Sequence, residues 1–474
     1  MKINPYIFRG YDIRGVVGEE ITSDAVLHIG RAFGTFLKRK GINSAIIGRD
    51  CRKTSPEYSK IMIESLNWSG VDTIDIGMEL VGTFYWAQHY FNIKGGVYIT
   101  ASHNPVDYNG FKLANDLSET LVSDDIQKLR VMIEKEDYDK AEIRAKNKEQ
   151  NIRDAYIKDL LSRFSGFDKR KVVIDPSCST AGTIAPNLLK KAGLDVVESN
   201  CKVDSSFPIS TPDPTAMENA ERLREKVLET SADVGFSYDA DGDRIGIVDD
   251  KGNIVWNDVL VALFAIDALR KNPGATIMYN TLCSRVVEDT IKEKGGVPFM
   301  WRTGHSFLKK KNQEVKADFI GELSGHFFFS ADFYNHDDGL YSTLRLLSYL
   351  TETGQTLKEA IDTLPKYISS PEIKVYCSDE KKVELIEKIS KLLKTDLKDA
   401  EIIDDERAGD GVRVDFKDSM FVIRYSQNAP YLTIKFEAKT EERYDALRKY
   451  IRKLLEKYEE VDWSSKINVN TSSL

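Results

Sequence analysis

One alternation of apolar and polar positions occurs three times along the chain, at residues 44–77, 171–198 and 275–304. Each copy begins with an apolar run rich in β-branched residues, such as KVVID or ATIMY. An amphipathic segment that ends at glycine follows, and a second apolar run completes the copy. Such an order is typical of parallel strands that are covered by helices. Three widely spaced copies predict three related α/β domains rather than a short-period solenoid.

The pattern changes after Pro371. Three strand-like runs, DGVRVDF, SMFVIRY and YLTIKFEA, lie between a helical segment at 380–394 and a charged amphipathic helix, EERYDALRKYIRKLLEK. Consecutive strands between helices predict an antiparallel α+β domain. The polar tail at 466–474 is expected to be loose.

The domain boundaries are placed where composition or turn signals change. These changes are a mixed-charge stretch at 134–153, a turn at 249–253, and the sequence Ser-Ser-Pro at 369–371. The expected domains are residues 1–148, 149–252, 253–366 and 367–474.

Composition narrows the class of protein. The 474 residues carry a net charge of −8, from 67 Lys and Arg against 75 Asp and Glu. A general polyanion binder would carry a basic face, so we expect no nucleic-acid partner. No run approaches the roughly 18 apolar residues of a membrane helix, so we expect no membrane association. Five scattered cysteines without a CxxC pair predict neither a disulfide framework nor a zinc site, and they fit a cytoplasmic location.

The strongest local motif is DADGDR, in which Asp239, Asp241 and Asp243 follow an apolar run. Carboxylates at alternate positions of an extended segment project to one side. Three like charges this close repel one another unless a cation lies between them, and oxygen ligands favour magnesium, manganese or calcium. An EF-hand is rejected, because position six is Arg244 rather than Gly and position twelve is Asp250 rather than Glu. The alternative is an acidic turn on the surface.

A second motif, TASHNP, follows the apolar run GVYIT. Ser102 is therefore expected at the carboxyl end of a strand, where open α/β sheets bind ligands, and a serine there can act as a nucleophile. A hydrolase dyad with His103 is rejected, because adjacent residues of an extended chain point opposite ways and the chain has no GxSxG elbow. The alternative is a polar turn with a capping serine.

Three weaker motifs carry polar groups suited to sugars or phosphates. GELSGH at 321–326 offers donors and acceptors for sugar hydroxyls, and Thr-Gly-His at 303–305 precedes it. The loop RYSQNAP at 424–430 offers a guanidinium and small polar groups for phosphate. RGYDIRG at 9–15 adds two arginines. Each of these motifs, taken alone, is more often an ordinary turn.

Taken together, the order and spacing of these motifs resemble the α-D-phosphohexomutase family, in particular its bacterial phosphomannomutase/phosphoglucomutase branch. The resemblance extends from about residue 8 to the final helix, and it includes the segment from WRTGHSFLKKK to DDGLYS. It implies three related mixed α/β sheet domains and a C-terminal α+β domain like the TATA-box-binding protein, around a central cleft. The implied activity is an intramolecular phosphotransfer that interconverts hexose 1-phosphate and hexose 6-phosphate through a phosphoserine and a bisphosphorylated sugar.

The resemblance also implies residue roles, cofactors and partners. Ser102 would carry the phosphoryl group and, with Asp239, Asp241 and Asp243, bind Mg²⁺. The other implied catalytic residues are Arg244 and His103, which would support the phosphoserine, and Lys112, Arg14 and His326, which would assist proton transfer or stabilise charge. The implied substrate-binding residues are Tyr11, His305, Glu322, Ser324, Arg424, Ser426, Gln427 and Asn428. A bisphosphorylated hexose would be the activator, and a monomer or weak dimer would act on a small phosphosugar.

Some positions depart from the family's pattern. Gln427 and Asn428 replace the Asn or Gly and the Thr of the phosphate loop, and Leu282 replaces a Lys. Leu323 is apolar, like the Met of the mannose and glucose branch, so those sugars are expected and glucosamine phosphate is the second choice. Two other functions stay open, namely a magnesium-dependent phosphatase with water as acceptor and a non-catalytic phosphosugar-binding protein.

Overall fold

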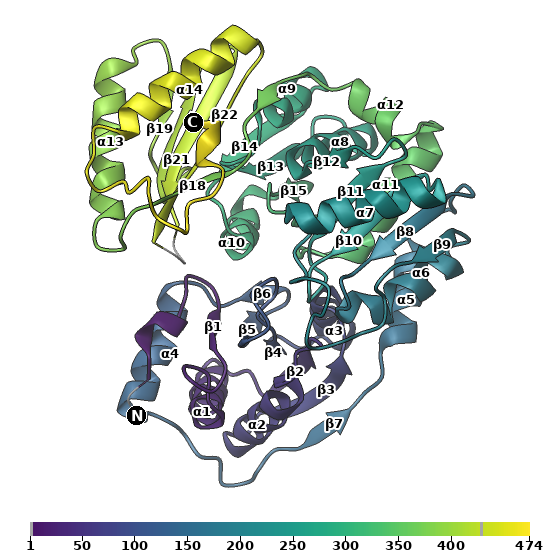
Figure 1. Cartoon of the computed structure of the whole chain (residues 1–474). Helices are drawn as coiled ribbons and strands as arrows, with labels where there is room; N and C mark the ends of the chain where they lie inside the picture. The colour runs from purple at the N-terminus through teal and green to yellow at the C-terminus, as the bar shows by residue number, and fades with distance from the viewer. Residues whose placement is uncertain (1–2, 427–429) are drawn as a thin grey trace. The chain divides into compact units, whose positions relative to one another are not determined.

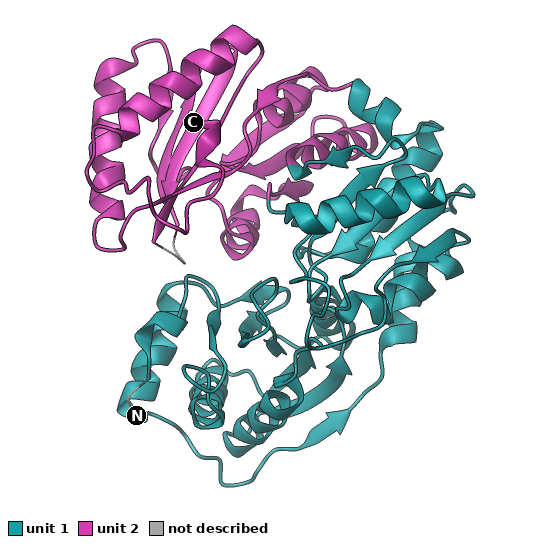
Figure 2. Ribbon diagram, viewed as in Figure 1, with its two compact units in different colours: residues 1–257, 324–362 teal, residues 258–323, 363–474 magenta. Residues whose placement is uncertain are grey.

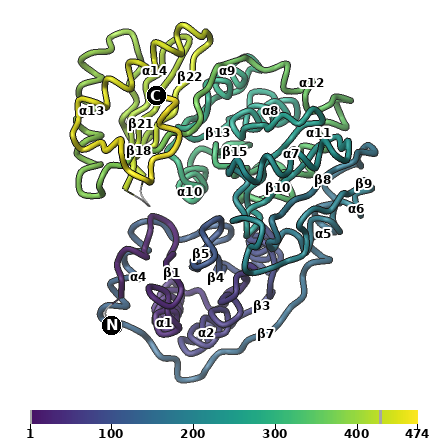
Figure 3. Tube along the Cα trace, in the orientation of Figure 1, coloured from purple at the N-terminus to yellow at the C-terminus, as the bar shows by residue number. Residues whose placement is uncertain are grey.

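The computed structural model describes residues 3–426 and 430–474, and its helices and strands are labelled in Figure 1. The chain separates into two compact units, which Figure 2 shows in different colours. The first unit contains residues 1–257 and 324–362, and the second contains residues 258–323 and 363–474. The course of the chain through each unit can be followed in Figure 3. Two expected substrate-binding residues, Gln427 and Asn428, lie outside the described residues.

The first unit begins with a seven-stranded mixed sheet of order β1-β5-β4-β2-β3-β7, with β6 beside β5. Its strands are β1 (Ile13–Val16), β2 (Ser44–Arg49), β3 (Asp72–Met78), β4 (Gly95–Ile99), β5 (Tyr108–Asp116), β6 (Glu119–Thr120) and β7 (Asn147–Glu149). Strand β2 is parallel to β3 and β4, whereas β5 is antiparallel to β1 and β4. Helix α2 (Ser55–Trp68) connects β2 to β3, so the first predicted strand–helix–strand unit is confirmed.

Helices cover both faces of this sheet. The alternating direction of the side chains along β4 shows which helix covers which face. Val97 and Ile99 share a core with α1 (Ser23–Arg39), α2 and α4 (Asp124–Lys135). Tyr98 lies between them in sequence, and its ring packs against Phe84 of α3 (Val81–Phe91), with 5.5 Å between centroids. Because successive strand residues point to opposite faces, α3 covers the face opposite α1, α2 and α4.

A second mixed sheet of the first unit has the order β12-β11-β10-β8-β9. Its strands are β8 (Lys171–Asp175), β9 (Asp195–Glu198), β10 (Val234–Tyr238), β11 (Ile245–Asp249) and β12 (Ile254–Val255). Strand β8 is parallel to β9 and β10, and β11 is antiparallel to β10. The second predicted strand–helix–strand unit is therefore confirmed. The remaining elements of the first unit are η1 (Pro5–Ile7), α5 (Arg153–Ser162), η2 (Thr180–Thr183), α6 (Ala185–Lys191), α7 (Met217–Thr230), β16 (Phe327–Phe328), α11 (Gly339–Thr353) and α12 (Leu357–Asp362).

The second unit contains the third predicted copy. Strand β13 (Thr276–Asn280) is parallel both to β14 (Val297–Trp301) and to β15 (Phe319–Gly321). Helix α9 (Arg285–Glu293) connects β13 to β14, as the sequence predicts. The other helices of this part are α8 (Asn257–Lys271) and α10 (His305–Val315).

The rest of the second unit is an antiparallel sheet of order β17-β22-β21-β20-β19, in which β18 also pairs with β22. Its elements are β17 (Ile368–Ser369), β18 (Ile373–Tyr376), α13 (Lys382–Asp396), β19 (Glu401–Ile403), β20 (Gly411–Asp415), β21 (Ser419–Tyr425), β22 (Tyr431–Ala438), α14 (Glu441–Leu455) and η3 (Thr471–Ser473). Helices α13 and α14 share one core with this sheet, which confirms the α+β prediction.

The expectation of a loose tail is wrong. The backbone of Val469 exchanges hydrogen bonds with Lys374, and Leu474 packs against the core of the C-terminal sheet. Backbone hydrogen bonds at Val469 and the apolar side chain of Leu474 hold this polar segment. The fold class is otherwise confirmed, and the three expected domain boundaries stay predictions. Within the described part of the chain, no helix has both the length and the apolar character to cross a bilayer.

The antiparallel sheet gives a first prediction. Ile434 is fully buried in β22 and lies between Ile373 and Ile423 of the neighbouring strands. Ile434→Ala should lower the free energy of unfolding by about 2–5 kcal/mol, because it leaves a cavity. Urea unfolding followed by circular dichroism measures the change. The control is Val383→Ala on α13, whose side chain is 45% exposed and should stay within about 0.5 kcal/mol of wild type. Equal losses in both variants would contradict this core.

Candidate active site

Ser102 lies in a turn directly after β4, at the carboxyl end of the strand. Its backbone adopts a left-handed conformation, with φ +48°, and its side chain is buried. The hydroxyl donates a hydrogen bond to Asp239 Oδ2 over 2.8 Å. The backbone N–H of Ser102 donates to Thr100 Oγ1 over 2.7 Å. The two strongest sequence motifs therefore meet through one hydrogen bond.

The reason for rejecting a pair of Ser102 and His103 is wrong, although its conclusion holds. The chain is not extended here, and Ser102 Oγ lies 3.1 Å from His103 Nδ1. Because the hydroxyl hydrogen is already donated to Asp239, Nδ1 donates to Oγ and does not accept from it. Desolvation, together with Arg244 and Arg14, lowers the pKa of His103 well below its ordinary value, so the ring is neutral at pH 7.

Asp239, Asp241 and Asp243 occupy the turn between β10 and β11, and all three are buried. They converge because the chain turns, not because it is extended as expected, and one oxygen of each lies within 4.8 Å of the others. Gly242 makes this turn possible. Its φ is +73°, and a Cβ atom there would lie 2.7 Å from Leu80 Cδ2.

Burial and mutual repulsion perturb these carboxylates. Desolvation, then Asp243 and Asp241, raise the pKa of Asp239 well above its ordinary value. Desolvation also acts to raise the pKa of Asp243, but Lys112 and His326 outweigh it and the net pKa shift is downward. Lys112 Nζ lies 2.9 Å from Asp241 Oδ2 and 2.6 Å from Asp243 Oδ2. Burial lowers the pKa of Lys112, but these two carboxylates raise it well above its usual range.

The acidic triad, meaning Asp239, Asp241 and Asp243, is suited to a divalent cation. Its ligands are all oxygen atoms, as hard cations require. Oδ1 of Asp241 and Oδ1 of Asp243 are buried and accept no hydrogen bond from the residues that the structure describes. Three protein carboxylates leave room for water or a phosphate oxygen, as at magnesium sites. The triad can therefore bind a metal ion beside Ser102.

A histidine completes this part of the first unit. Arg244 Nε donates to His326 Nε2 over 3.0 Å, and His326 Nδ1 lies 2.7 Å from Asp337 Oδ2. The first contact makes Nε2 a hydrogen-bond acceptor, and the carboxylate of Asp337 faces the other ring nitrogen. Desolvation alone would lower the pKa of Arg244, but Asp239 and Asp243 reverse the shift and raise it. Asp337 was not singled out from the sequence, although the resemblance includes its DDG motif.

Arg14 of β1 reaches the serine turn. Its Nη1 donates to Asn104 Oδ1 over 2.9 Å, and its Nη2 pairs with Asp12 Oδ2 over 2.7 Å. Tyr11 is half-buried and close enough to Arg14 to affect the pKa of that guanidinium. Ser324 also belongs to the first unit and is half-buried. The structure therefore brings Arg14 into direct contact with the serine turn.

The second unit carries the other predicted residues. His305 is the first residue of α10, and Glu322 follows β15. Both side chains are buried, and Glu322 Oε1 accepts a hydrogen bond from the backbone N–H of Gly304 over 2.8 Å. This bond joins the loop at 303–305 to the loop after β15. The backbone N–H of Leu323 donates to Asn280 Oδ1 over 3.1 Å, so the strand end of β13 also holds the second loop.

The predicted phosphate loop connects β21 to β22. Arg424 Nε donates to Asp410 Oδ1 over 2.8 Å, and its Nη2 pairs with the other oxygen of the same carboxylate. Lys382 Nζ donates to the backbone carbonyl of Ser426 over 2.6 Å. Sequence reasoning missed both Asp410 and Lys382, because they are distant in the chain and belong to no motif.

The second unit also has a buried positive charge near Leu282, the position at which the family's pattern has Lys. Arg413 donates to the backbone carbonyls of Thr281 and Cys283 over 2.8 and 2.7 Å. The guanidinium is paired with Asp415, and Leu282 is itself buried. Arg413 therefore holds the backbone on both sides of Leu282. It does not take the place of the Lys side chain that the family's pattern has at position 282.

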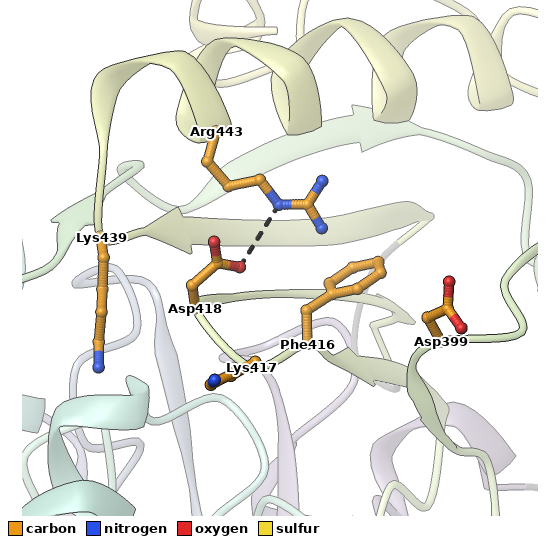
Figure 4. A pocket seen from close by; sticks show the side chains of 6 residues that line it. All are labelled: Asp399, Phe416, Lys417, Asp418, Lys439 and Arg443. Carbon is orange, nitrogen blue, oxygen red and sulfur yellow. Dashed lines mark ion pairs between the residues drawn. The ribbon is translucent and has the colours of Figure 1, made fainter.

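A separate hollow lies on the C-terminal part of the second unit (Figure 4). Its volume is about 470 Å³, and its lining residues are Asp399, Phe416, Lys417, Asp418, Lys439 and Arg443. Arg443 Nε lies 3.6 Å from Asp418 Oδ1, and the guanidinium covers the ring of Phe416. None of the predicted site residues that the structure describes lines this hollow, so the proposed chemistry lies elsewhere.

Comparison with known proteins identifies relatives for the whole chain. Family models described as phosphoglucomutase/phosphomannomutase domains I, II and III and as the C-terminal domain match residues 5–140, 154–252, 256–367 and 372–454. A phosphomannomutase/phosphoglucomutase of Pseudomonas syringae is 38% identical over 92% of each chain, and a phosphoglucomutase of Neisseria gonorrhoeae is 35% identical over 96% of this chain and 98% of its own. A crystal structure of a phosphoglucomutase/phosphomannomutase family protein from Burkholderia thailandensis has a TM-score of 0.88 and 32% identity, and covers 96% of this chain and 98% of its own.

The acidic triad gives a second prediction. The pKa of Asp239 in the folded protein is raised above the ordinary aspartate value of 3.8. As the pH rises above 3.8, ionisation of Asp239 therefore lowers the stability of the folded protein. At pH 7 without metal, Asp239→Asn should therefore be at least as stable as wild type. Mg²⁺ at a hundred times its Kd should stabilise wild type by about 2.7 kcal/mol, and the variant by much less.

Thermal unfolding with EDTA and with MgCl₂ measures both effects. The control is Asp250→Asn, which removes a carboxylate just after β11 that pairs with Lys251. This control should keep the wild-type response to Mg²⁺. An equal rise in Tm for wild type and Asp239→Asn would place the metal elsewhere.

Proposed function

Because the chain belongs to the phosphoglucomutase/phosphomannomutase family and is a hexose-phosphate mutase, we propose that it interconverts mannose and glucose 1- and 6-phosphates through a phosphoserine at Ser102. The observation that carries the proposal is the 2.8 Å hydrogen bond between Ser102 Oγ and Asp239 of the buried acidic triad. Phosphoryl transfer depends mainly on positioning and charge neutralisation, and this arrangement offers both.

The triad and an oxygen on Ser102 would hold Mg²⁺, which would neutralise charge on the phosphoserine. Arg244 would share this task, since its Nε lies 3.8 Å from Asp239 Oδ2. His103 would donate to the ester oxygen through Nδ1, the atom that already faces Ser102 Oγ. The burial of Ser102 would protect the phosphoserine from hydrolysis by water.

In the proposed reaction, a free sugar hydroxyl attacks the phosphorus atom and the bond from phosphorus to Ser102 Oγ breaks. The hydroxyl proton leaves the sugar and an equivalent proton returns to Oγ, so the charge balances. His326 and Lys112 are the candidates for moving this proton, and Arg14 would stabilise the transferring group. The sugar then carries two phosphates, turns over, and returns its other phosphoryl group to Ser102. A bisphosphorylated hexose would therefore also serve as activator.

Recognition of the substrate is assigned mainly to the second unit. Arg424 and Ser426, with Gln427 and Asn428 outside the described residues, would bind the phosphate that is not transferred. Glu322 and His305, whose loops are joined by the hydrogen bond from Gly304 to Glu322, would bind sugar hydroxyls. Ser324 and Tyr11 of the first unit would complete the set.

The choice of sugar rests on the relatives' names and on apolar Leu323 in the sugar loop. A coupled assay of mannose, glucose and glucosamine 1-phosphates, with Mg²⁺ and the matching bisphosphate, tests this choice directly. Turnover of glucosamine 1-phosphate alone would contradict it. Turnover of phosphosugar to inorganic phosphate would indicate a phosphatase.

A third prediction concerns Ser102. Ser102→Ala should lower kcat at least 10³-fold, because it removes the atom that carries the phosphoryl group. Intact mass after incubation with glucose 1,6-bisphosphate should show one added phosphate on wild type and none on the variant. The control is Ser231→Ala, an exposed serine that also has a positive φ, of +50°. This control should keep both activity and the added phosphate. An active Ser102→Ala variant would disprove the phosphoserine mechanism.

A fourth prediction concerns Arg424. A Lys side chain cannot make the two parallel hydrogen bonds of a guanidinium. Arg424→Lys should therefore raise KM roughly tenfold and change kcat much less, since charged hydrogen bonds are worth about 1.5–3 kcal/mol. The control is Arg407→Lys, another arginine of the second unit that contacts both oxygens of one aspartate. Steady-state kinetics measures both variants, and an unchanged KM for Arg424→Lys would contradict the phosphate assignment.

A further inference from the structure

One buried arginine holds the backbone of the serine turn. Arg52 is only 2% exposed. Its Nη2 donates to the carbonyls of Ser102 and Asn104 over 2.7 and 2.6 Å. Its Nη1 donates to the carbonyls of Pro105 and Tyr108 over 2.6 and 2.9 Å. A single planar group thus fixes four backbone carbonyls of the turn that carries Ser102.

The charge of Arg52 is compensated on its other sides. Its Nε lies 3.3 Å from Oδ2 of Asp50, which is fully buried. Asp50 Oδ1 in turn accepts from the backbone N–H of Arg52 and from Ser55 Oγ. The ring of Phe207 covers the guanidinium at 5.2 Å. Burying an ion pair is costly unless its hydrogen bonds are satisfied, and nearly all the donors of Arg52 are directed at the serine turn.

The same segment also contacts the acidic triad's turn. Cys51 forms an apolar cluster with Phe207 and with Ala240, which lies between Asp239 and Asp241. The backbone N–H of Cys51 donates to Thr180 Oγ1 over 3.0 Å. Next to Thr180 in sequence, Ser179 Oγ donates to the carbonyl of Asp239 over 3.2 Å. Residues 50–52 therefore lie against both turns that the reaction must bring together.

We propose that Arg52 is a positioning residue for phosphoryl transfer, which holds Ser102 Oγ at the correct distance from the acidic triad. This inference rests on the proposed role of Ser102. The left-handed conformation of Ser102 is costly for a residue with a side chain, so the surrounding structure must impose it. Four hydrogen bonds to the turn supply that restraint. A displacement of about 1 Å at a reacting group can cost roughly 10²-fold in rate.

The test is Arg52→Lys, which keeps the positive charge but offers one compact ammonium in place of the planar fork. We expect kcat to fall roughly 10²-fold with KM nearly unchanged, because the hydrogen bonds of the Arg52 guanidinium go to the backbone of the serine turn. The control is Arg170→Lys. Arg170 donates to the backbone carbonyls of Leu350 and Gln355 in the same unit, but not to the serine turn. This control should match the loss of Tm without the loss of kcat.

Phosphoserine formation separates this inference from the proposed function. Wild type and Arg52→Lys are incubated with glucose 1,6-bisphosphate, and the added phosphate is followed in time by intact mass. We expect wild type to gain the phosphate quickly and the Arg52→Lys variant slowly. When the purified phosphoenzymes transfer this phosphate to glucose 1-phosphate, the variant should again be the slower of the two. If wild type gains no phosphate, the proposed function fails. If wild type gains the phosphate, and Arg52→Lys equals wild type in kcat, in the rate of phosphoserine formation and in the rate of transfer to glucose 1-phosphate, the positioning role of Arg52 is refuted.

Phe207→Leu provides a second variant if Arg52→Lys does not fold. It keeps Arg52 and an apolar side chain but removes the ring face over the guanidinium. We expect a several-fold fall in kcat with KM unchanged. A folded Phe207→Leu protein with wild-type kcat, or a rise in KM at constant kcat, would overturn the proposal.

Discussion

Burial of three carboxylates in one turn is the constraint on which the rest of the first unit depends. Two unit charges 4 Å apart repel by about 4 kcal/mol at an effective dielectric constant of 20. In the triad, one oxygen of each carboxylate lies within 4.8 Å of the others. Lys112, beside Asp241 and Asp243, and Arg244, beside Asp239, offset part of this repulsion. Desolvation and the two neighbouring carboxylates still hold the pKa of Asp239 high. The site therefore favours any group that brings positive charge, and a metal ion supplies the most.

Compensation of this kind requires rigid neighbours, because an uncompensated buried charge costs several kcal/mol. Lys112 is held in β5, and its ammonium lies between two of the aspartates. Arg244 is tied to His326, which is tied to Asp337. These residues come from distant parts of the sequence but from one compact unit. The fold thus fixes the relative positions of charges that could not stay close in a mobile loop.

The sequence predicts the fold well because helix and strand periodicity is local information. The segments at 44–77, 171–198 and 275–304 contain the expected strands and helices. The motifs also point to Ser102 and to the acidic triad, since both follow apolar, strand-like runs. Backbone turns and partners across the fold are not local. Neither the left-handed Ser102 nor the donors of Arg52 can be read from spacing, and Val469 holds a tail whose polar composition indicates disorder.

The division of residues between the two units has a consequence for how variants should behave. The groups proposed to carry chemistry, from Ser102 to His326, lie in the first unit, whereas Arg424, Ser426, His305 and Glu322 lie in the second. Interactions that hold substrate and transition state equally affect KM, and interactions made only as the phosphoryl group moves affect kcat. Arg424 is already oriented by Asp410, so the phosphate binding proposed for it would need little reorganisation. Substitutions at the proposed recognition residues and at the proposed phosphoryl-transfer residues should therefore have separable effects on KM and kcat.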